Sequence, residues 1–212
     1  MKRFFEDGET VLFYGDSVTD VDRKREDLYD LGNGYPSKVK KIYDVLFPGN
    51  KVTFINKGVS GDRTKDLASR LDNDCLGFKP DFVSILIGVN DAWRKYDSND
   101  PTSPEEFEKN YRTVLSRIKK ELPGTKILIM EPYVLFSVPE RVVFHEELDP
   151  FIVIERKLAR EYADYYLCLE GAFAKHIAEG ATDSEISEDG VHPTDAGHSI
   201  IAYEILKTLD II

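Results

Sequence analysis

The feature that most constrains the fold of this chain is a regular alternation of short apolar runs with longer amphipathic segments. Five apolar runs predict strands, at residues 10–14, 52–55, 82–87, 127–130 and 165–169. Apolar residues at helical spacing predict helices, at residues 35–47, 64–71, 104–122, 149–163, 172–179 and 193–209. Strands that alternate with helices form a parallel sheet covered on both faces. With right-handed crossovers, the predicted fold is α/β, a three-layer α/β/α sandwich.

Length and charge limit what the chain can be and what it can bind. Its 212 residues suit one domain spanning residues 1–212, and we find no internal repeat or linker. The 28 basic and 39 acidic residues give a formal net charge of −11. A surface this acidic repels phosphate backbones and anionic lipids, so we expect neither a nucleic acid nor a membrane as partner. The expected partner is a small neutral molecule, and a homo-oligomer stays open.

Two further features bear on the compartment. The first eight residues turn acidic before any apolar run develops, and no apolar stretch approaches the eighteen or so residues of a membrane span. We therefore expect a cytoplasmic protein. Cys75 and Cys168 are the only cysteines, and a chain of this size needs no disulfide. Both cysteines are expected to be reduced and at least partly buried.

Four short elements rich in glycine and polar residues follow predicted strands. They are GDS at 15–17, GVSG at 58–61, GVND at 88–91 and DGVHP at 189–193. The first three come directly after strands, and the fourth lies between the last strand and the last helix. Because the carboxyl ends of parallel strands meet at one edge of a sheet, and ligands of open α/β sheets bind there, we expect these elements to form one site.

The residue types in these elements permit acyl transfer. Ser17 would attack a carbonyl carbon, and His192 would accept its proton and later protonate the leaving alcohol. Asp189 stands three residues before His192, so one turn can bring its carboxylate to the imidazole. The backbone N–H groups of Ser17 and Gly61 and the side-chain amide of Asn90 would then bind the oxyanion.

Each element taken alone has an ordinary structural explanation as a turn or cap, and only their joint occurrence favours catalysis. A metal-dependent phosphohydrolase built on Asp20, Asp22 and Asp91 is one alternative, and a non-catalytic binding module is another. A separate metal site would consist of Asp189, His192, Asp195 and His198. It is disfavoured, because Pro193 breaks the helix between the first pair and the second. We expect no metal and no cofactor.

Taken together, the four elements resemble the sequence blocks of the SGNH hydrolases, also called GDSL esterases. The matching residues are Ser17, Gly61, Asn90 and His192, with Asp189 completing the triad, and Val18 replaces the usual leucine. The resemblance implies a flavodoxin-like sandwich of five parallel strands in the order 2-1-3-4-5. It also implies a hydrolase that works without a metal.

A narrower resemblance is to intracellular acetylxylan esterases, which deacetylate xylo-oligosaccharides. It rests on GY at 34–35, NKGVSG at 56–61, NDAWRKYD at 90–97 and VHP at 191–193. It implies a small, neutral acetyl ester of a carbohydrate as substrate, with a short-chain acyl thioesterase or a general lipolytic esterase as the alternatives.

Three residues are candidates for substrate contacts: Trp93, Tyr35 and Asp16. Trp93, the only tryptophan, faces a sugar ring or packs beneath the site, with packing slightly favoured. Asp16 is also expected to shape its turn. Residues 131–147 form a long irregular segment with several apolar residues, and three roles stay open for it: a substrate wall, a subunit contact, or a loop packed on its own domain.

Overall fold

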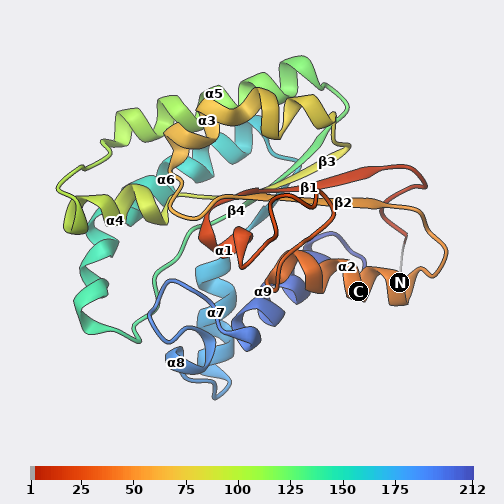
Figure 1. The fold of residues 1–212 in the computed structure, drawn as a ribbon. Coiled ribbons are helices and arrows are strands. Elements are labelled where there is room, and N and C mark those ends of the chain that lie inside the picture. The colour runs from red at the N-terminus through yellow and green to blue at the C-terminus, as the bar shows by residue number, and fades with distance from the viewer. Residues whose placement is uncertain (1–2) are drawn as a thin grey trace.

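The computed structural model describes residues 3–212 and contains one sheet of five parallel strands in the order β2-β1-β3-β4-β5 (Figure 1). The strands are β1 (Thr10–Gly15), β2 (Thr53–Gly58), β3 (Phe82–Leu86), β4 (Lys126–Met130) and β5 (Tyr165–Leu167). The predicted fold class and strand order are confirmed. The middle strand, β3, is buried along its whole length.

Helices cover both faces of this sheet. The helices are α1 (Ser17–Asp20), α2 (Tyr35–Leu46), α3 (Thr64–Asp74), α4 (Val89–Asp97), α5 (Pro104–Glu121), α6 (His145–Tyr162), α7 (Leu169–Ala178), α8 (Asp183–Ile186) and α9 (Asp195–Thr208), with 3-10 turns η1 (Leu76–Phe78) and η2 (Pro139–Phe144). Figure 1 shows α3, α5 and α6 on one side of the sheet and α2, α7 and α9 on the other. Within residues 3–212, no helix is both long and apolar enough to cross a membrane.

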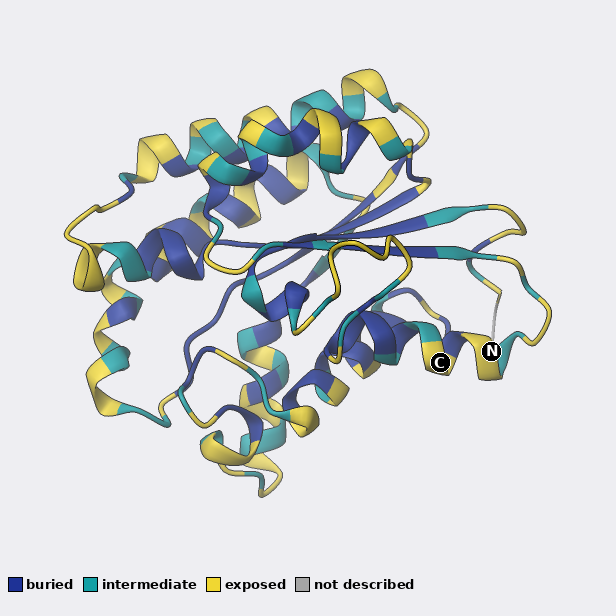
Figure 2. Ribbon diagram, viewed as in Figure 1, coloured by how far each residue is buried: buried dark blue, intermediate teal, exposed yellow. Residues whose placement is uncertain are grey.

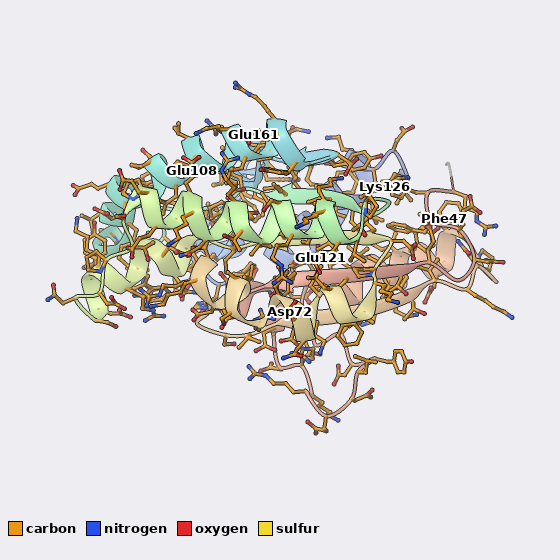
Figure 3. All side chains as sticks on the ribbon, turned by 90° about the horizontal axis from the view of Figure 1, so that it is seen from above. Phe47, Asp72, Glu108, Glu121, Lys126 and Glu161 are labelled. Atoms are coloured by element: carbon orange, nitrogen blue, oxygen red, sulfur yellow. The ribbon has the colours of Figure 1, made fainter. Side chains whose placement is uncertain are left out.

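The alternation of side chains along β1 divides the core in two. Leu12 and Tyr14 pack into the cluster under α3, α5 and α6, whereas Val11 and Phe13 pack into the cluster under α2 and α9. Figure 2 shows the strands buried and the outer faces of the helices exposed. Charged side chains cover these outer faces (Figure 3); Arg117 of α5, for example, pairs with Asp72 and Glu121.

Several helices differ from the prediction, and α4 and α6 differ most clearly. Residues 88–91 were expected to form a turn, but Gly88 is the N-cap of α4, which runs to Asp97 and places Asn90 in its first turn. Helix α6 begins at His145, four residues before the predicted start, although Pro150 lies inside it. A proline in the second turn of a helix removes only one backbone hydrogen bond. The helix can therefore begin several residues before Pro150.

The cysteines agree with the prediction only in part. Both are free, and Cys75 is buried as expected. Cys168 is exposed, which contradicts the expectation that it is at least partly buried. It follows directly after the short edge strand β5, where no further strand covers the chain.

Residues 131–147 pack against the loop that precedes α9. The Leu135 N–H donates to the Gly190 carbonyl at 2.8 Å, and the Tyr133 hydroxyl donates to the Val191 carbonyl at 2.9 Å. The Ser137 hydroxyl donates to the Ser187 carbonyl. These contacts make the segment a support for residues 187–192, in line with a loop packed on its own domain.

At Gly190 the two segments approach each other closely. The φ of this glycine is +83°, and a Cβ added there would lie 2.7 Å from the Leu135 carbonyl oxygen. Gly49 has a similar φ of +91° but no atom within 4 Å of an added Cβ, so it is a matched control.

We predict that Gly190→Ala lowers the free energy of unfolding by about 3 kcal/mol or more, because backbone strain and a collision with backbone act together. Gly49→Ala should lose only about 1–2 kcal/mol, from strain alone. Urea unfolding of both variants measures the difference. Equal losses would contradict the steric account of Gly190.

Candidate active site

Ser17 lies at the carboxyl end of β1, as the sequence predicted. The chain leaves β1 at Gly15 and enters the one-turn helix α1, whose N-cap is Asp16 and whose first residue is Ser17. The Asp16 carboxylate accepts a hydrogen bond from the Val18 N–H at 3.0 Å. This cap orients the turn so that the Ser17 Oγ lies 2.9 Å from His192 Nε2.

His192 is joined to Asp189 on its other side. The distance from His192 Nδ1 to Asp189 Oδ2 is 2.8 Å. The second carboxylate oxygen, Oδ1, accepts from the N–H groups of Val191 at 2.9 Å and His192 at 2.7 Å. Ser17, His192 and Asp189 therefore form a continuous chain of hydrogen bonds, although the serine and histidine are 175 residues apart in sequence.

The electrostatics of this chain suit a histidine base. Partial burial by itself raises the pKa of Asp189, but the hydrogen bonds from His192, Arg141 and Val191 outweigh burial and hold it well below its usual range. The carboxylate is therefore ionised at neutral pH. Its hydrogen bond to the imidazole raises the pKa of His192 above the ordinary value.

The three predicted oxyanion donors surround the same turn. Among residues 3–212, the backbone N–H groups of Ser17 and Gly61 have no hydrogen-bond partner. The Asn90 amide is nearly buried, and its orientation is set from both sides: Arg94 donates to its Oδ1 at 3.1 Å, and its Nδ2 donates to the Asp62 carbonyl at 3.0 Å. The next partner of this Nδ2 is Asp16 Oδ2 at 3.5 Å, which leaves one N–H only weakly engaged.

An arginine that the sequence analysis did not single out connects two of these turns. Arg70 of α3 donates to the Gly15 carbonyl at 3.0 Å, to the Lys57 carbonyl at 2.9 Å and to the Asp62 carboxylate at 2.6 Å. It thereby fixes the ends of β1 and β2 relative to each other.

Arg94, which donates to the Asn90 side chain, was also not singled out from the sequence. Its spacing could have indicated it, since it stands four residues after Asn90 on a helix.

Three residues were candidates for substrate contacts. Tyr35 and Asp16 are buried, and Trp93 is partly buried. Tyr35 is fully buried and hydrogen-bonds Thr19 at 3.0 Å, so the prediction that it contacts substrate is wrong. Asp16 is only 1% exposed, so it does not contact substrate either. Its hydrogen bond with the Val18 N–H agrees with the expected role in shaping the turn. Burial raises the pKa of Asp16 to about 7. The Trp93 ring lies 6.0 Å from the His192 ring and 5.5 Å from Phe144.

A pocket of about 230 Å³ opens beside the nucleophile. It is lined by Ser17, Val18, Val21, Asp22, Ser60, His192, Pro193 and His198. His198 is buried, accepts a hydrogen bond from the Tyr35 N–H at 3.2 Å, and has its pKa lowered to about 4 by burial. The pocket therefore combines Ser17 and His192 with small apolar side chains, the buried His198 and one acidic residue, Asp22.

The carboxylates of the alternative phosphohydrolase site have separate partners. Asp20 pairs with Arg25 at 2.7 Å and accepts from Ser60, whereas Asp91 accepts two hydrogen bonds from Thr64. Asp22 is exposed. In the part of the chain that the structure describes, no three or more His, Cys, Asp or Glu side chains are grouped to hold a metal ion.

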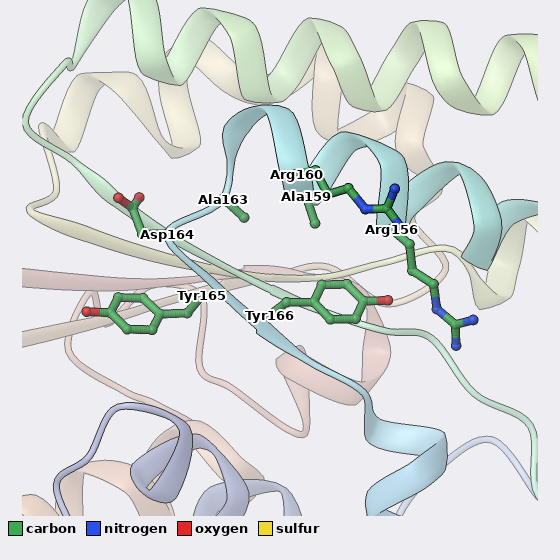
Figure 4. Close-up of a pocket in the computed structure, with 7 residues that line it drawn as sticks. All are labelled: Arg156, Ala159, Arg160, Ala163, Asp164, Tyr165 and Tyr166. Carbon is green, nitrogen blue, oxygen red and sulfur yellow. The ribbon is translucent and has the colours of Figure 1, made fainter.

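A larger hollow of about 390 Å³ lies elsewhere, between the C-terminal part of α6 and the edge strand β5 (Figure 4). Its polar lining consists of two arginines, two tyrosines and Asp164. None of its lining residues is a histidine, serine or cysteine, so it offers no pair of nucleophile and base. The predicted nucleophile and base lie together at the edge that carries Ser17.

Comparison with known proteins agrees with the resemblance seen in the sequence. The model of the GDSL-like Lipase/Acylhydrolase family matches residues 13–200. An acetylxylan esterase of Geobacillus stearothermophilus is 30% identical, over 95% of this chain and 94% of the relative. An arylesterase of Vibrio mimicus is 28% identical, over 94% of this chain and 96% of that protein.

Solved structures agree with the sequence matches. The crystal structure of the acetylxylan esterase Axe2 from Geobacillus stearothermophilus aligns with a TM-score of 0.87 at 30% identity, covering 98% of this chain and 96% of that one. A putative GDSL-like lipase from Parabacteroides merdae aligns with a TM-score of 0.91 at 29% identity, covering 98% of both chains. The chain therefore belongs to the GDSL-like Lipase/Acylhydrolase family and is a carboxylic ester hydrolase.

Proposed function

We propose that this protein is a serine esterase that removes small acyl groups, foremost acetyl, from a neutral carbohydrate such as a xylo-oligosaccharide. One observation carries the proposal: the hydrogen-bond chain from Ser17 through His192 to Asp189. The Ser17 and Gly61 N–H groups and the Asn90 amide supply donors beside it. These are the parts that acyl transfer through a covalent intermediate needs.

The acylation half of the reaction follows from these positions. Ser17 Oγ attacks the ester carbonyl carbon as its proton passes to His192 Nε2, and the carbonyl oxygen becomes an oxyanion held by the three donors. The bond between the carbonyl carbon and the alcohol oxygen then breaks. His192 gives its proton to that oxygen, and the alcohol leaves. Asp189, ionised throughout, stabilises the imidazolium that forms in between.

Deacylation repeats these steps with water. A water molecule attacks the acyl-serine as His192 accepts its proton, the second tetrahedral intermediate collapses, and Ser17 Oγ recovers the proton while the carboxylic acid is released. No metal or cofactor enters this scheme.

Three observations support a small acyl group on a neutral carbohydrate. Acetylxylan esterases are among the relatives, at 30% identity over nearly the whole chain. The pocket beside Ser17 is small, at about 230 Å³. The net charge of −11 disfavours an anionic acyl carrier.

The first prediction concerns the nucleophile. Ser17→Ala should lower kcat/KM for ester hydrolysis by roughly four orders of magnitude or more, as deletion of a triad nucleophile does in other enzymes. Ser69→Ala, an exposed serine on α3, is the matched control and should keep normal turnover. Activity in Ser17→Ala within about tenfold of the wild type would contradict the mechanism.

The second prediction is the pH profile. His192 accepts a proton only when neutral, and its pKa is raised above the ordinary 6.5 by Asp189. As pH falls below this raised pKa, kcat/KM should therefore decline about tenfold per pH unit. Initial rates on an uncharged ester between about pH 5 and pH 9 measure it. A profile without an acidic limb would rule out a histidine base.

The third prediction concerns the substrate. A panel of acetylated xylo-oligosaccharides, nitrophenyl esters of rising acyl length and acyl-CoA should give the highest kcat/KM with the acetylated sugars, and rates should fall as the acyl chain lengthens. A preference for acyl-CoA would replace the carbohydrate esterase by a thioesterase. A preference for long acyl chains would favour a general lipolytic esterase.

A further inference from the structure

One cation on the 131–147 segment reaches the candidate triad. Arg141, in η2, donates from Nη1 to the Asp189 carbonyl at 2.7 Å, and the same nitrogen forms an ion pair with Asp189 Oδ2 at 2.7 Å. Asp189 Oδ2 is also the oxygen that pairs with His192 Nδ1, at 2.8 Å. The arginine and the imidazole therefore share one carboxylate oxygen.

The same arginine also contacts the aromatic residue beside the histidine. Its guanidinium carbon lies 4.5 Å from the centre of the Trp93 ring, a cation–π distance, and the Trp93 ring in turn lies 6.0 Å from the His192 ring. Arg141 is about three-quarters buried at its side chain, with 25% exposed. Its position is thus fixed by a hydrogen bond, an ion pair and a cation–π contact.

We propose, on the basis of the proposed function, that Arg141 is a positioning residue for the triad: it fixes the Asp189 carboxylate toward His192 and neutralises part of its charge, so that His192 stays unprotonated and active at lower pH. A lone carboxylate stabilises the imidazolium strongly, and a guanidinium on the same oxygen opposes this effect. Arg141 acts through Asp189 and touches no reacting atom.

Two roles of Arg141 have to be separated, since loss of the side chain would remove both packing and charge. The Asp189 Oδ1 atom keeps its bonds to the Val191 and His192 N–H groups when Arg141 is replaced. The triad geometry should therefore survive in part. The charge effect, by contrast, should be lost completely. Its loss raises the pKa of His192, whereas a loosened hydrogen bond to Asp189 would lower it, so the two roles shift the titration of His192 in opposite directions.

Other charged groups also act on His192 and have to be considered. Besides Asp189, Asp16 raises the pKa of His192 and Arg141 lowers it. Asp22 and His198 line the pocket that His192 faces. Arg94 of α4 lies 5.8 Å from the Trp93 ring. Asp16 has a pKa of about 7, so it titrates in the same range. In the control variant His192→Gln the histidine no longer titrates, so any pH dependence that is left there comes from Asp16 or another group.

The kinetic test compares Arg141→Met, Arg141→Gln and Arg141→Lys. In the first two, the acidic limb of kcat/KM should move upward by roughly half a pH unit or more, with a plateau loss on the order of tenfold. Arg141→Lys keeps the charge and should return the limb most of the way to its original pH. Arg117→Met, which removes an equally charged residue paired with Asp72 and Glu121, should leave the limb in place.

A second measurement needs no turnover. Trp93 is the only tryptophan, and a protonated imidazole quenches a neighbouring indole. The pH midpoint of Trp93 fluorescence should therefore report His192, should disappear in His192→Gln, and should move upward in Arg141→Met and Arg141→Gln.

The outcomes distinguish this proposal from the proposed function. If Ser17→Ala retains turnover, the esterase mechanism fails, while the fluorescence midpoints still test the effect of Arg141 on His192. If Ser17→Ala is inactive but both the kinetic limb and the fluorescence midpoint are unmoved in Arg141→Met and Arg141→Gln, the role of Arg141 is overturned. An equal shift in Arg117→Met would also overturn it, because the effect would then be one of net charge.

Discussion

The parallel register of β1 with its two neighbours is the constraint on which the rest of the site depends. Gly15 at the end of β1 pairs with Gly58 of β2 on one side and with Leu86 of β3 on the other. The three strands therefore end in register, and the turns that follow them start at the same edge of the sheet. A side chain on Gly15 would lie 2.5 Å from the Leu86 carbonyl oxygen, so the approach of the chains requires glycine there.

The buried carboxylates around this edge each have a hydrogen-bond donor as partner. Asp16, Asp62 and Asp91 lie beneath the site, and burial raises the pKa of each of them. Each has a fixed partner: the Val18 N–H for Asp16, Arg70 for Asp62 and Thr64 for Asp91. Asp189, at the rim, is different, because its hydrogen bonds keep it ionised. Burial thus separates carboxylates that shape turns from the one that can stabilise an imidazolium.

The 131–147 segment connects the sheet with this rim. It leaves the end of β4, where Glu131 is fully buried, and runs along the loop that carries Asp189 and His192. Its backbone and side chains bond the carbonyls of Ser187, Gly190 and Val191. The loop also has hydrogen bonds of its own, from Ser187 to the His192 carbonyl and from the Val191 and His192 N–H groups to Asp189, so internal bonds and the 131–147 segment together fix the position of His192.

Much of the fold and of the candidate site could be predicted from the sequence, because both depend on local patterns. The alternation of strands and helices defines the sandwich, and Ser17, Gly61, Asn90 and Asp189 stand in short elements at the ends of strands or before the last helix. The start of α5 was also predictable, since Ser103 and Glu106 form a capping box around Pro104.

The tertiary structure alone decided what depends on contacts between distant segments. Arg141 reaches Asp189 across 48 residues of sequence, and no spacing rule relates the two. Tyr35 looked available for substrate, but α2 packs it into the core, and Cys168 is exposed because β5 is a short edge strand. Spacing along a chain determines which side chains share a turn or a helix face, whereas burial and long-range pairing depend on how whole elements pack. The sequence by itself therefore determined the fold and the candidate site residues, and the packing of the 131–147 segment decided how the Asp189–His192 loop is supported.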